Sequence, residues 1–163
     1  MITIRRINTS DVYDLITYAE IDISLEKQYN SNNRIEFFAV TDGKKLLGHA
    51  SVILFSSIST AQVNEIYILP QERNNGLGDA LLRAVFHYLR INFFVWTIIK
   101  SHTNLDKFLI NRGIEQIDYS KLPYQIKSHF EKEDLHEYYI CNIEEFFKQK
   151  CKGSELNSHN LKV

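Results

Sequence analysis

The sequence is poor in the residues that mark unusual protein classes. Only two cysteines, Cys141 and Cys151, occur in 163 residues, which excludes a disulfide framework and suits a reducing compartment. Six glycines and two prolines are too few for a low-complexity or disordered chain. A chain of this length buries roughly two thirds of its unfolded surface, so it can fold as one domain without disulfide bonds.

Neither sign of charge dominates the sequence. Nineteen lysines and arginines oppose twenty aspartates and glutamates, for a net charge of −1. This balance excludes a strongly basic nucleic-acid-binding protein. The basic residues are also dispersed, without the aromatic and basic cluster of an RNA platform. We therefore expect no nucleic-acid partner.

Long apolar runs are also missing. The most apolar stretch, Phe93 to Ile99, is far shorter than the roughly 20 residues of a membrane-spanning helix. The first seven residues alternate apolar and polar side chains and lack the apolar core of a signal peptide. We expect a cytoplasmic protein that does not bind membranes.

Hydrophobic patterns in the first half predict a helical start and then an antiparallel meander. Asp42-Gly43 between two apolar runs is a strong hairpin signal, and Ser56 to Thr60 is expected to be a polar turn. Strands are predicted over residues 1–7, 36–41, 45–55 and 63–69. Helices are predicted from the start signal Thr9-Ser10-Asp11 and over residues 25–29.

In the second half the strongest pattern is an amphipathic helix over residues 76–91, with an apolar stripe at Leu77, Leu81, Val85 and Leu89. Further strands are predicted over 93–99, 114–119 and 138–143, and a short helix over 105–111 that stops at Arg112-Gly113. Residues 122–134 are charged and ambiguous. We expect a single domain over 1–152 and a polar, mobile tail over 153–163.

The most informative segment joins the strand at 63–69 to the helix at 76–91 and reads Arg73-Asn74-Asn75-Gly76-Leu77-Gly78. The first amides of a helix lack intrahelical partners, and the helix dipole places about half a positive charge there. Glycine lets an anion such as a pyrophosphate approach the backbone, and an arginine can add a charge-assisted hydrogen bond. The alternative is an ordinary strand–helix turn that uses glycine for packing.

Two common phosphate loops do not match. The sequence has no Gly-x-x-x-x-Gly-Lys-Ser/Thr motif, and the dinucleotide fingerprint would need a glycine where Leu81 stands. In the spacing of the Arg73 to Gly78 loop and in the order of elements, residues 1–143 resemble the GNAT superfamily of acetyl-CoA-dependent acyltransferases.

The resemblance implies an α/β (α+β) fold. Its central sheet would be mixed and mostly antiparallel, with about six to seven strands, flanking helices and one splayed parallel pair. It also implies acetyl-CoA as cosubstrate and an N-acetyltransferase that moves an acetyl group to an amine by direct attack in a ternary complex.

Coenzyme-binding residues follow from the same resemblance. Backbone groups of Ile66 and Ile68 would pair with the pantetheine and the acetyl carbonyl, where their strand splays from the one at 94–99. The pyrophosphate loop would consist of Arg73, Asn74, Asn75, Gly76, Leu77, Gly78 and Asp79.

Catalysis requires a proton acceptor, because deprotonating an alkylammonium at pH 7 costs about 4.6 kcal/mol. Glu65 is the first candidate, although strand alternation turns it away from Ile66 and Ile68. A surface or ion-paired glutamate is the alternative. His102 is the second candidate, with a loop histidine as the alternative.

The family's usual proton donor is a tyrosine at the position of Leu109, so another tyrosine would have to act. Tyr67 is preferred because it lies on the coenzyme strand, ahead of Tyr119, Tyr124, Tyr138 and Tyr139. Other histidines are weaker candidates for the base: His49, His87, His129 and His136. Cys141 fits a core position, and no metal site is predicted.

Leu109 also keeps a second function open, a catalytically weak or inactive module that binds CoA and contacts other proteins. For the enzyme, the acceptor would be a small-molecule or peptide amine. Acidic residues could favour a cationic amine or could simply be solvated: Asp22, Glu26, Glu131, Glu133, Asp134 and Glu137. The oligomeric state is not determined by the sequence, and a homodimer stays open.

Overall fold

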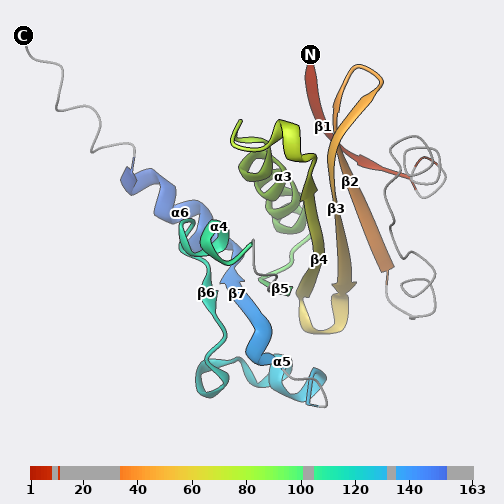
Figure 1. Ribbon diagram of the computed structural model, residues 1–163. Helices are drawn as coiled ribbons and strands as arrows, with labels where there is room; N and C mark the ends of the chain where they lie inside the picture. The colour runs from red at the N-terminus through yellow and green to blue at the C-terminus, as the bar shows by residue number, and fades with distance from the viewer. Residues whose placement is uncertain (9–10, 12–33, 101–104, 132–134, 154–163) are drawn as a thin grey trace, which may run out of the picture.

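The computed structural model describes residues 1–8, 11, 34–100, 105–131 and 135–153. These residues contain one seven-stranded sheet with the strand order β1-β2-β3-β4-β5-β7-β6 (Figure 1). The strands are β1 (Ile2–Ile7), β2 (Arg34–Asp42), β3 (Lys45–Phe55), β4 (Thr60–Ile68), β5 (Trp96–Lys100), β6 (Glu115–Gln116) and β7 (Tyr138–Asn142). Only β4 and β5 pair in parallel within this sheet, which confirms the predicted mixed, mostly antiparallel arrangement.

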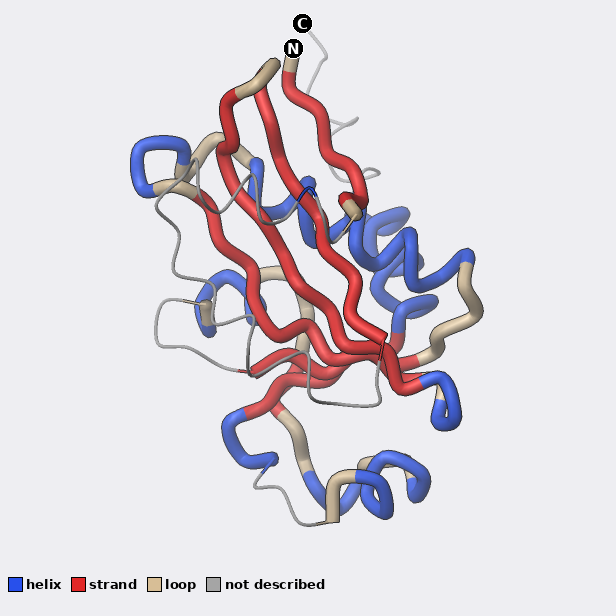
Figure 2. The backbone as a smooth tube through the Cα atoms, turned by 90° about the vertical axis from the view of Figure 1, so that its right-hand side faces the viewer, coloured by secondary structure: helices blue, strands red, loops and turns tan. Residues whose placement is uncertain are grey.

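The α-helices of the described residues are α3 (Leu77–Ile91), α4 (Asp106–Ile110), α5 (Tyr124–His129) and α6 (Ile143–Gly153). The predicted apolar stripe of α3 is buried and packs on one face of the sheet, against Val63 and Ile99. Because strand side chains alternate between faces, Ile98 lies on the opposite face, in a second apolar cluster with Ile126 of α5. Figure 2 shows the strands side by side with the helices around them. In the described part of the chain, no helix is long and apolar enough to cross a membrane.

The predicted hairpin at Asp42-Gly43 is confirmed. Asp42 pairs with Lys45 across the turn, and Gly43 has a φ of 57°, a conformation that glycine adopts without steric cost. The helices expected from residue 9 and over 25–29 lie outside the described residues, apart from Asp11, which is helical.

Three strands differ from their predicted bounds by three residues at one end. β4 begins at Thr60, three residues early, and β6 is only two residues long. β5 begins at Trp96 rather than at Phe93, because the chain must reverse after α3. Phe93 takes a φ of 65° in this turn, and its ring is 86% exposed.

Helix α6 is not among the predicted elements, which end with the strand over 138–143. The structure instead begins α6 at Ile143, and the Glu145 N–H donates a 3.1 Å hydrogen bond to Oδ1 of Asn142. An asparagine in this position caps a helix N-terminus. Apart from Gly153 itself, the tail expected over 153–163 falls outside the described residues.

Candidate active site

The strand that carries the predicted coenzyme residues leaves its parallel neighbour halfway along. Among the described residues, which stop at Lys100 on the β5 side, β4 pairs with β5 from Thr60↔Trp96 to Val63↔Ile99 and not beyond. At that point the register between β3 and β4 shifts, because Val52 faces Val63 while Ser51 faces Glu65. Asn64 is therefore a bulge residue. A bulge bends its strand and increases the local twist, which accounts for the predicted splay.

The open edge of β4 presents backbone groups of Ile66 and Ile68. The N–H of Leu69 donates to the carbonyl of Leu47, so Leu69 and Leu47 form a hydrogen-bonded pair. Antiparallel pairs alternate between hydrogen-bonded and non-hydrogen-bonded. The backbone groups of Ile68 and Ile66 therefore point away from β3, toward the side where the pairing with β5 has ended.

The loop after β4 is curled by two residues in left-handed conformation. Asn74 has a φ of 64° and Gly76 a φ of 76°, and alternation of this kind makes concave sets of amides that bind anions. Gly76 is also the N-cap of the 15-residue helix α3, and no side chain caps that helix. The first amides of α3, at Leu77, Gly78 and Asp79, thus sit at a helix start without a side-chain acceptor.

Arg73 turns back toward β4 rather than out of the loop. Its Nε donates a 2.9 Å hydrogen bond to the carbonyl of Ile68, and its guanidinium lies 5.7 Å from the centre of the Tyr67 ring. Arg73 therefore braces the end of β4. It also occupies the Ile68 carbonyl, so the N–H is the Ile68 backbone group that stays available at the open edge.

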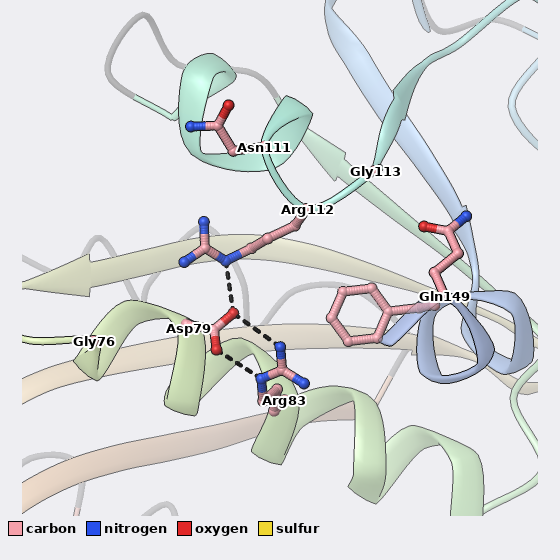
Figure 3. A pocket seen from close by; sticks show the side chains of 8 residues that line it. Gly76, Asp79, Arg83, Asn111, Arg112, Gly113 and Gln149 are labelled. Atoms are coloured by element: carbon pink, nitrogen blue, oxygen red, sulfur yellow. Dashed lines mark hydrogen bonds and ion pairs between the residues drawn. The ribbon is translucent and has the colours of Figure 1, made fainter. Parts of the chain in front are cut away.

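Asp79 lies in the first turn of α3 and holds two arginines (Figure 3). Its carboxylate accepts hydrogen bonds from Nε and Nη2 of Arg83, at 2.7 and 3.2 Å, and from Nε of Arg112 at 2.7 Å. Burial alone would raise the pKa of Asp79, but the hydrogen bonds from Arg83 and Arg112 outweigh it and lower the pKa below its ordinary value. Asp79 is therefore ionised at neutral pH.

These side chains line a cavity of about 560 Å³ between α3, the end of α4 and α6. We call it the α3–α4–α6 pocket. Its lining residues are Gly76, Asp79, Arg83, Asn111, Arg112, Gly113, Phe146 and Gln149. The pocket begins at Gly76, so it is continuous with the predicted pyrophosphate loop.

Glu65 and Tyr67 lie on the face of the sheet away from α3, as the alternation of β4 predicts, since Ile66 and Ile68 pack in the core under α3. Nε2 of His49 lies 3.1 Å from Oε2 of Glu65, and the His49 ring is 5.4 Å from the Tyr67 ring. This His49–Glu65 contact lacks hydrogen-bond geometry. Among the described residues, neither imidazole nitrogen of His49 has a hydrogen-bond partner, and the buried Oγ of Ser51 has none either. Buried polar atoms of this kind call for water or a ligand.

At the position expected for the proton-donating tyrosine, the structure has a leucine. Leu109 is fully buried in the core, and the neighbouring Phe108 ring stacks 3.8 Å from the guanidinium of Arg112. Tyr119 and Tyr124 are exposed, whereas Tyr138 and Tyr139 are core residues. Burial, followed by the charge of Asp106, raises the pKa of Tyr139. His102 lies outside the described residues.

Sequence reasoning did not single out Arg83 or Arg112, and it treated His49 only as one of the weaker candidate bases. Arg83 is four residues after Asp79, a spacing that brings two side chains together on a helix and could have been recognised. Arg112 was interpreted only as part of a helix stop. His49 carries no local signal, because its contact with Glu65 depends on the pairing of β3 with β4.

Comparison with known proteins shows which family the sequence matches. The family model described as "Acetyltransferase (GNAT) family" matches residues 3–108. No curated protein sequence matches the chain.

Among solved structures, a GNAT-family acetyltransferase from Staphylococcus aureus Mu50 is 19% identical with a TM-score of 0.65, covering 88% of this chain and 99% of that one. Tetrahymena GCN5 is 12% identical with a TM-score of 0.69, and the match covers 86% of this chain and 96% of that one. N-acetylglutamate synthase from Neisseria gonorrhoeae, solved with coenzyme A and N-acetyl-glutamate, is 18% identical with a TM-score of 0.63, covering 88% of this chain and 35% of that one.

Proposed function

Because the chain belongs to the acetyltransferase (GNAT) family, we propose that it transfers an acetyl group from acetyl-CoA to an amine. The observation that carries the proposal is the path of β4. The strand leaves β5 after Val63, exposes one backbone edge, and ends in a loop at the uncapped start of α3. This path offers a row of backbone donors and acceptors beside an anion site, which suits a long ligand with a pyrophosphate.

Each part of the coenzyme has a proposed set of residues. The amides from Asn74 to Gly78, with Asp79 beside them, bind the pyrophosphate, and Arg73 keeps the loop attached to β4. Backbone groups of Ile66 and Ile68 bind the pantetheine arm. The Ile68 N–H donates to the thioester carbonyl and stabilises the negative charge that develops on its oxygen. When bound, acetyl-CoA supplies an acetyl group already activated as a thioester.

Glu65 is the proposed proton acceptor. Its side chain is 37% exposed while that of His49 is 6% exposed, so a carboxylate at the surface is backed by a buried imidazole. The acceptor ammonium gives a proton to Glu65 directly or through one water, and the free amine attacks the acetyl carbon without a covalent enzyme intermediate. As the C–S bond breaks, Tyr67 is proposed to give its phenolic proton to the departing thiolate and to regain one from the attacking nitrogen, which loses its second proton as the amide forms. His102 stays a predicted second base.

The acceptor is proposed to be a small-molecule or peptide amine that reaches Glu65 from the face opposite α3. A primary ammonium is favoured, because Glu65 attracts a cation before it accepts a proton from it. The low cysteine content supports a reducing, cytoplasmic setting as part of this proposal.

The proposal is tested by calorimetric titration of acetyl-CoA and CoA into the wild type and into Gly76→Glu. A carboxylate at Gly76 repels the pyrophosphate, so micromolar binding by the wild type should be lost. The matched control is Gly43→Glu, since Gly43 also has a positive φ and open space around it but lies in the β2–β3 turn. Wild-type protein that binds neither ligand would contradict the proposal.

One observation favours a second candidate, a CoA-binding module with little or no transferase activity. Leu109 stands where a tyrosine would donate the proton, and it is fully buried. This module would bind CoA as tightly as the enzyme would. Binding that Gly76→Glu abolishes, together with no release of free CoA thiol from acetyl-CoA across a panel of primary amines, would favour it over the transferase.

A further inference from the structure

The α3–α4–α6 pocket is larger than a pyrophosphate requires. It extends from Gly76 at the start of α3 to Gln149 on α6, and its volume of about 560 Å³ is within the range of sites for small ligands. The amide side chains of Asn111 and Gln149 and the ring of Phe146 also line it. Phe146 is only 4% exposed, so the amide groups of Asn111 and Gln149 are the part of this wall that can hydrogen-bond a nucleobase.

The pocket carries one net positive charge. The single carboxylate of Asp79 is shared between Arg83 and Arg112. Nη1 of Arg112 donates to the carbonyl of Phe108, which leaves Nη1 of Arg83 and Nη2 of Arg112 without a hydrogen bond to any described residue. Guanidinium groups with donors to spare bind phosphate oxygens well.

Both guanidinium groups are also held in place. Arg112 lies 3.8 Å from the centre of the Phe108 ring, and Arg83 lies 5.6 Å from the centre of the Phe146 ring. Stacking on aromatic rings and pairing with Asp79 restrict both side chains before a ligand arrives. A preorganised site loses less conformational entropy on binding.

We propose that Arg83 and Arg112 bind the 3′-phosphate of the coenzyme's adenosine, and that Phe146 and Gln149 of α6 form the wall of the adenosine site. The inference rests on the proposed function, since it assumes that the pyrophosphate occupies the neighbouring loop. A ribose with a 5′-pyrophosphate at Gly76 and a 3′-phosphate at the arginines spans the continuous pocket. Arg83 lies within residues 3–108, which the family model matches, whereas Arg112 and α6 lie beyond them.

The test compares CoA with 3′-dephospho-CoA by calorimetry. The wild type is expected to bind CoA about tenfold to a hundredfold more tightly, the effect of hydrogen bonds to a charged group. Arg112→Gln is expected to lower the affinity for CoA and to leave the affinity for 3′-dephospho-CoA unchanged. The ratio of the two affinities should then approach one. Arg90→Gln is the control, because Arg90 pairs with the exposed Glu144 outside the pocket.

Gln149→Glu is the second variant, at an exposed position where misfolding is not expected. A carboxylate at this position should lower the affinity for CoA more than the affinity for 3′-dephospho-CoA, because only CoA carries the 3′-phosphate. Equal binding of the two ligands by the wild type would overturn this inference and leave the proposed function standing. Failure of the wild type to bind either ligand would overturn both.

Discussion

Asp79 joins the coenzyme loop to the rest of the molecule, because its carboxylate holds one arginine of α3 and one that follows α4. Its pKa is lower in the folded chain than in the unfolded chain. A depressed pKa contributes stability that is present above the unfolded-state pKa, near 4, and is lost as the pH falls through the folded-state value.

Asp79→Asn is therefore expected to lower the free energy of unfolding by about 1 kcal/mol at pH 7, and the difference from the wild type should vanish in acid. Urea unfolding at pH 7 and near pH 3 measures this. Glu131→Gln, at an exposed position, serves as the control. A difference that is the same at both pH values would show that the charge of Asp79 is not the cause.

Glu65→Gln should lower kcat about a hundredfold without changing the affinity for CoA, because Glu65 lies on the face of the sheet opposite the core under α3. His49→Gln should lower kcat less. If His49 affects catalysis only through its 3.1 Å contact with Glu65, the double variant should be no worse than Glu65→Gln, because effects within one unit are not additive.

Initial rates of CoA release, with the best acceptor from a screen of amines, provide the measurement. His87→Gln is the matched control because His87 is exposed on α3. If the losses from Glu65→Gln and His49→Gln simply add, the two residues do not act as a pair.

Cys141 is predicted to be chemically inert. Burial, with a smaller contribution from the charge of Glu115, raises the pKa of its thiol to about 12, so almost no reactive thiolate exists near neutral pH. Iodoacetamide at pH 8 should leave Cys141 unmodified in the folded protein and modify it in urea, as peptide mass spectrometry would reveal. Rapid labelling of the native protein would be evidence against a core position.

At the scale of elements, α6 is where sequence and structure diverge most. The alternation of side chains over 138–143 correctly predicted β7. It gave no sign that a helix begins directly afterwards, because Asn142 both ends the strand and caps the helix. The spacing of Asn142 and Glu145 was a usable capping signal. Missing α6 also meant missing the pocket that its residues Phe146 and Gln149 line.

The cap at Asn142 can be tested directly. Asn142→Ala should lower the free energy of unfolding by about 1 kcal/mol, because the Glu145 N–H loses its acceptor. Asn142→Asp keeps an acceptor at the same position and should restore most of the loss. Thermal or urea unfolding measures both variants. Equal destabilisation by the two substitutions would mean that packing of β7, not the cap, is what Asn142 contributes.

The strand that forms the site was only partly predictable. The apolar run and Pro70 identified β4, and the Arg73 to Gly78 spacing identified the loop. The bulge at Asn64 was not predictable, because it arises from the register between β3 and β4. Neither strand alone contains a sequence pattern that indicates it. The contact of His49 with Glu65 depends on the same long-range register.

For the molecule as a whole, the sheet and its first long helix have one consequence for function. The described pairing of β4 with β5 ends at Val63, and α3 covers the face of the sheet beside it. The ligand proposed for this edge would therefore touch β4, the loop and α3 together. Residues 3–108 carry the family match, and the later residues add the α4 end and α6. Of the two arginines proposed for the 3′-phosphate, Arg83 lies within the matched residues and Arg112 follows them.

The most direct test of the central claim is backbone amide NMR during titration with CoA. We expect chemical-shift changes concentrated at Ile66 to Asp79 and at Asn111 to Gly113, with little change in the β2–β3 turn at Gly43. No change at the β4–α3 loop, or changes centred on another surface, would contradict it.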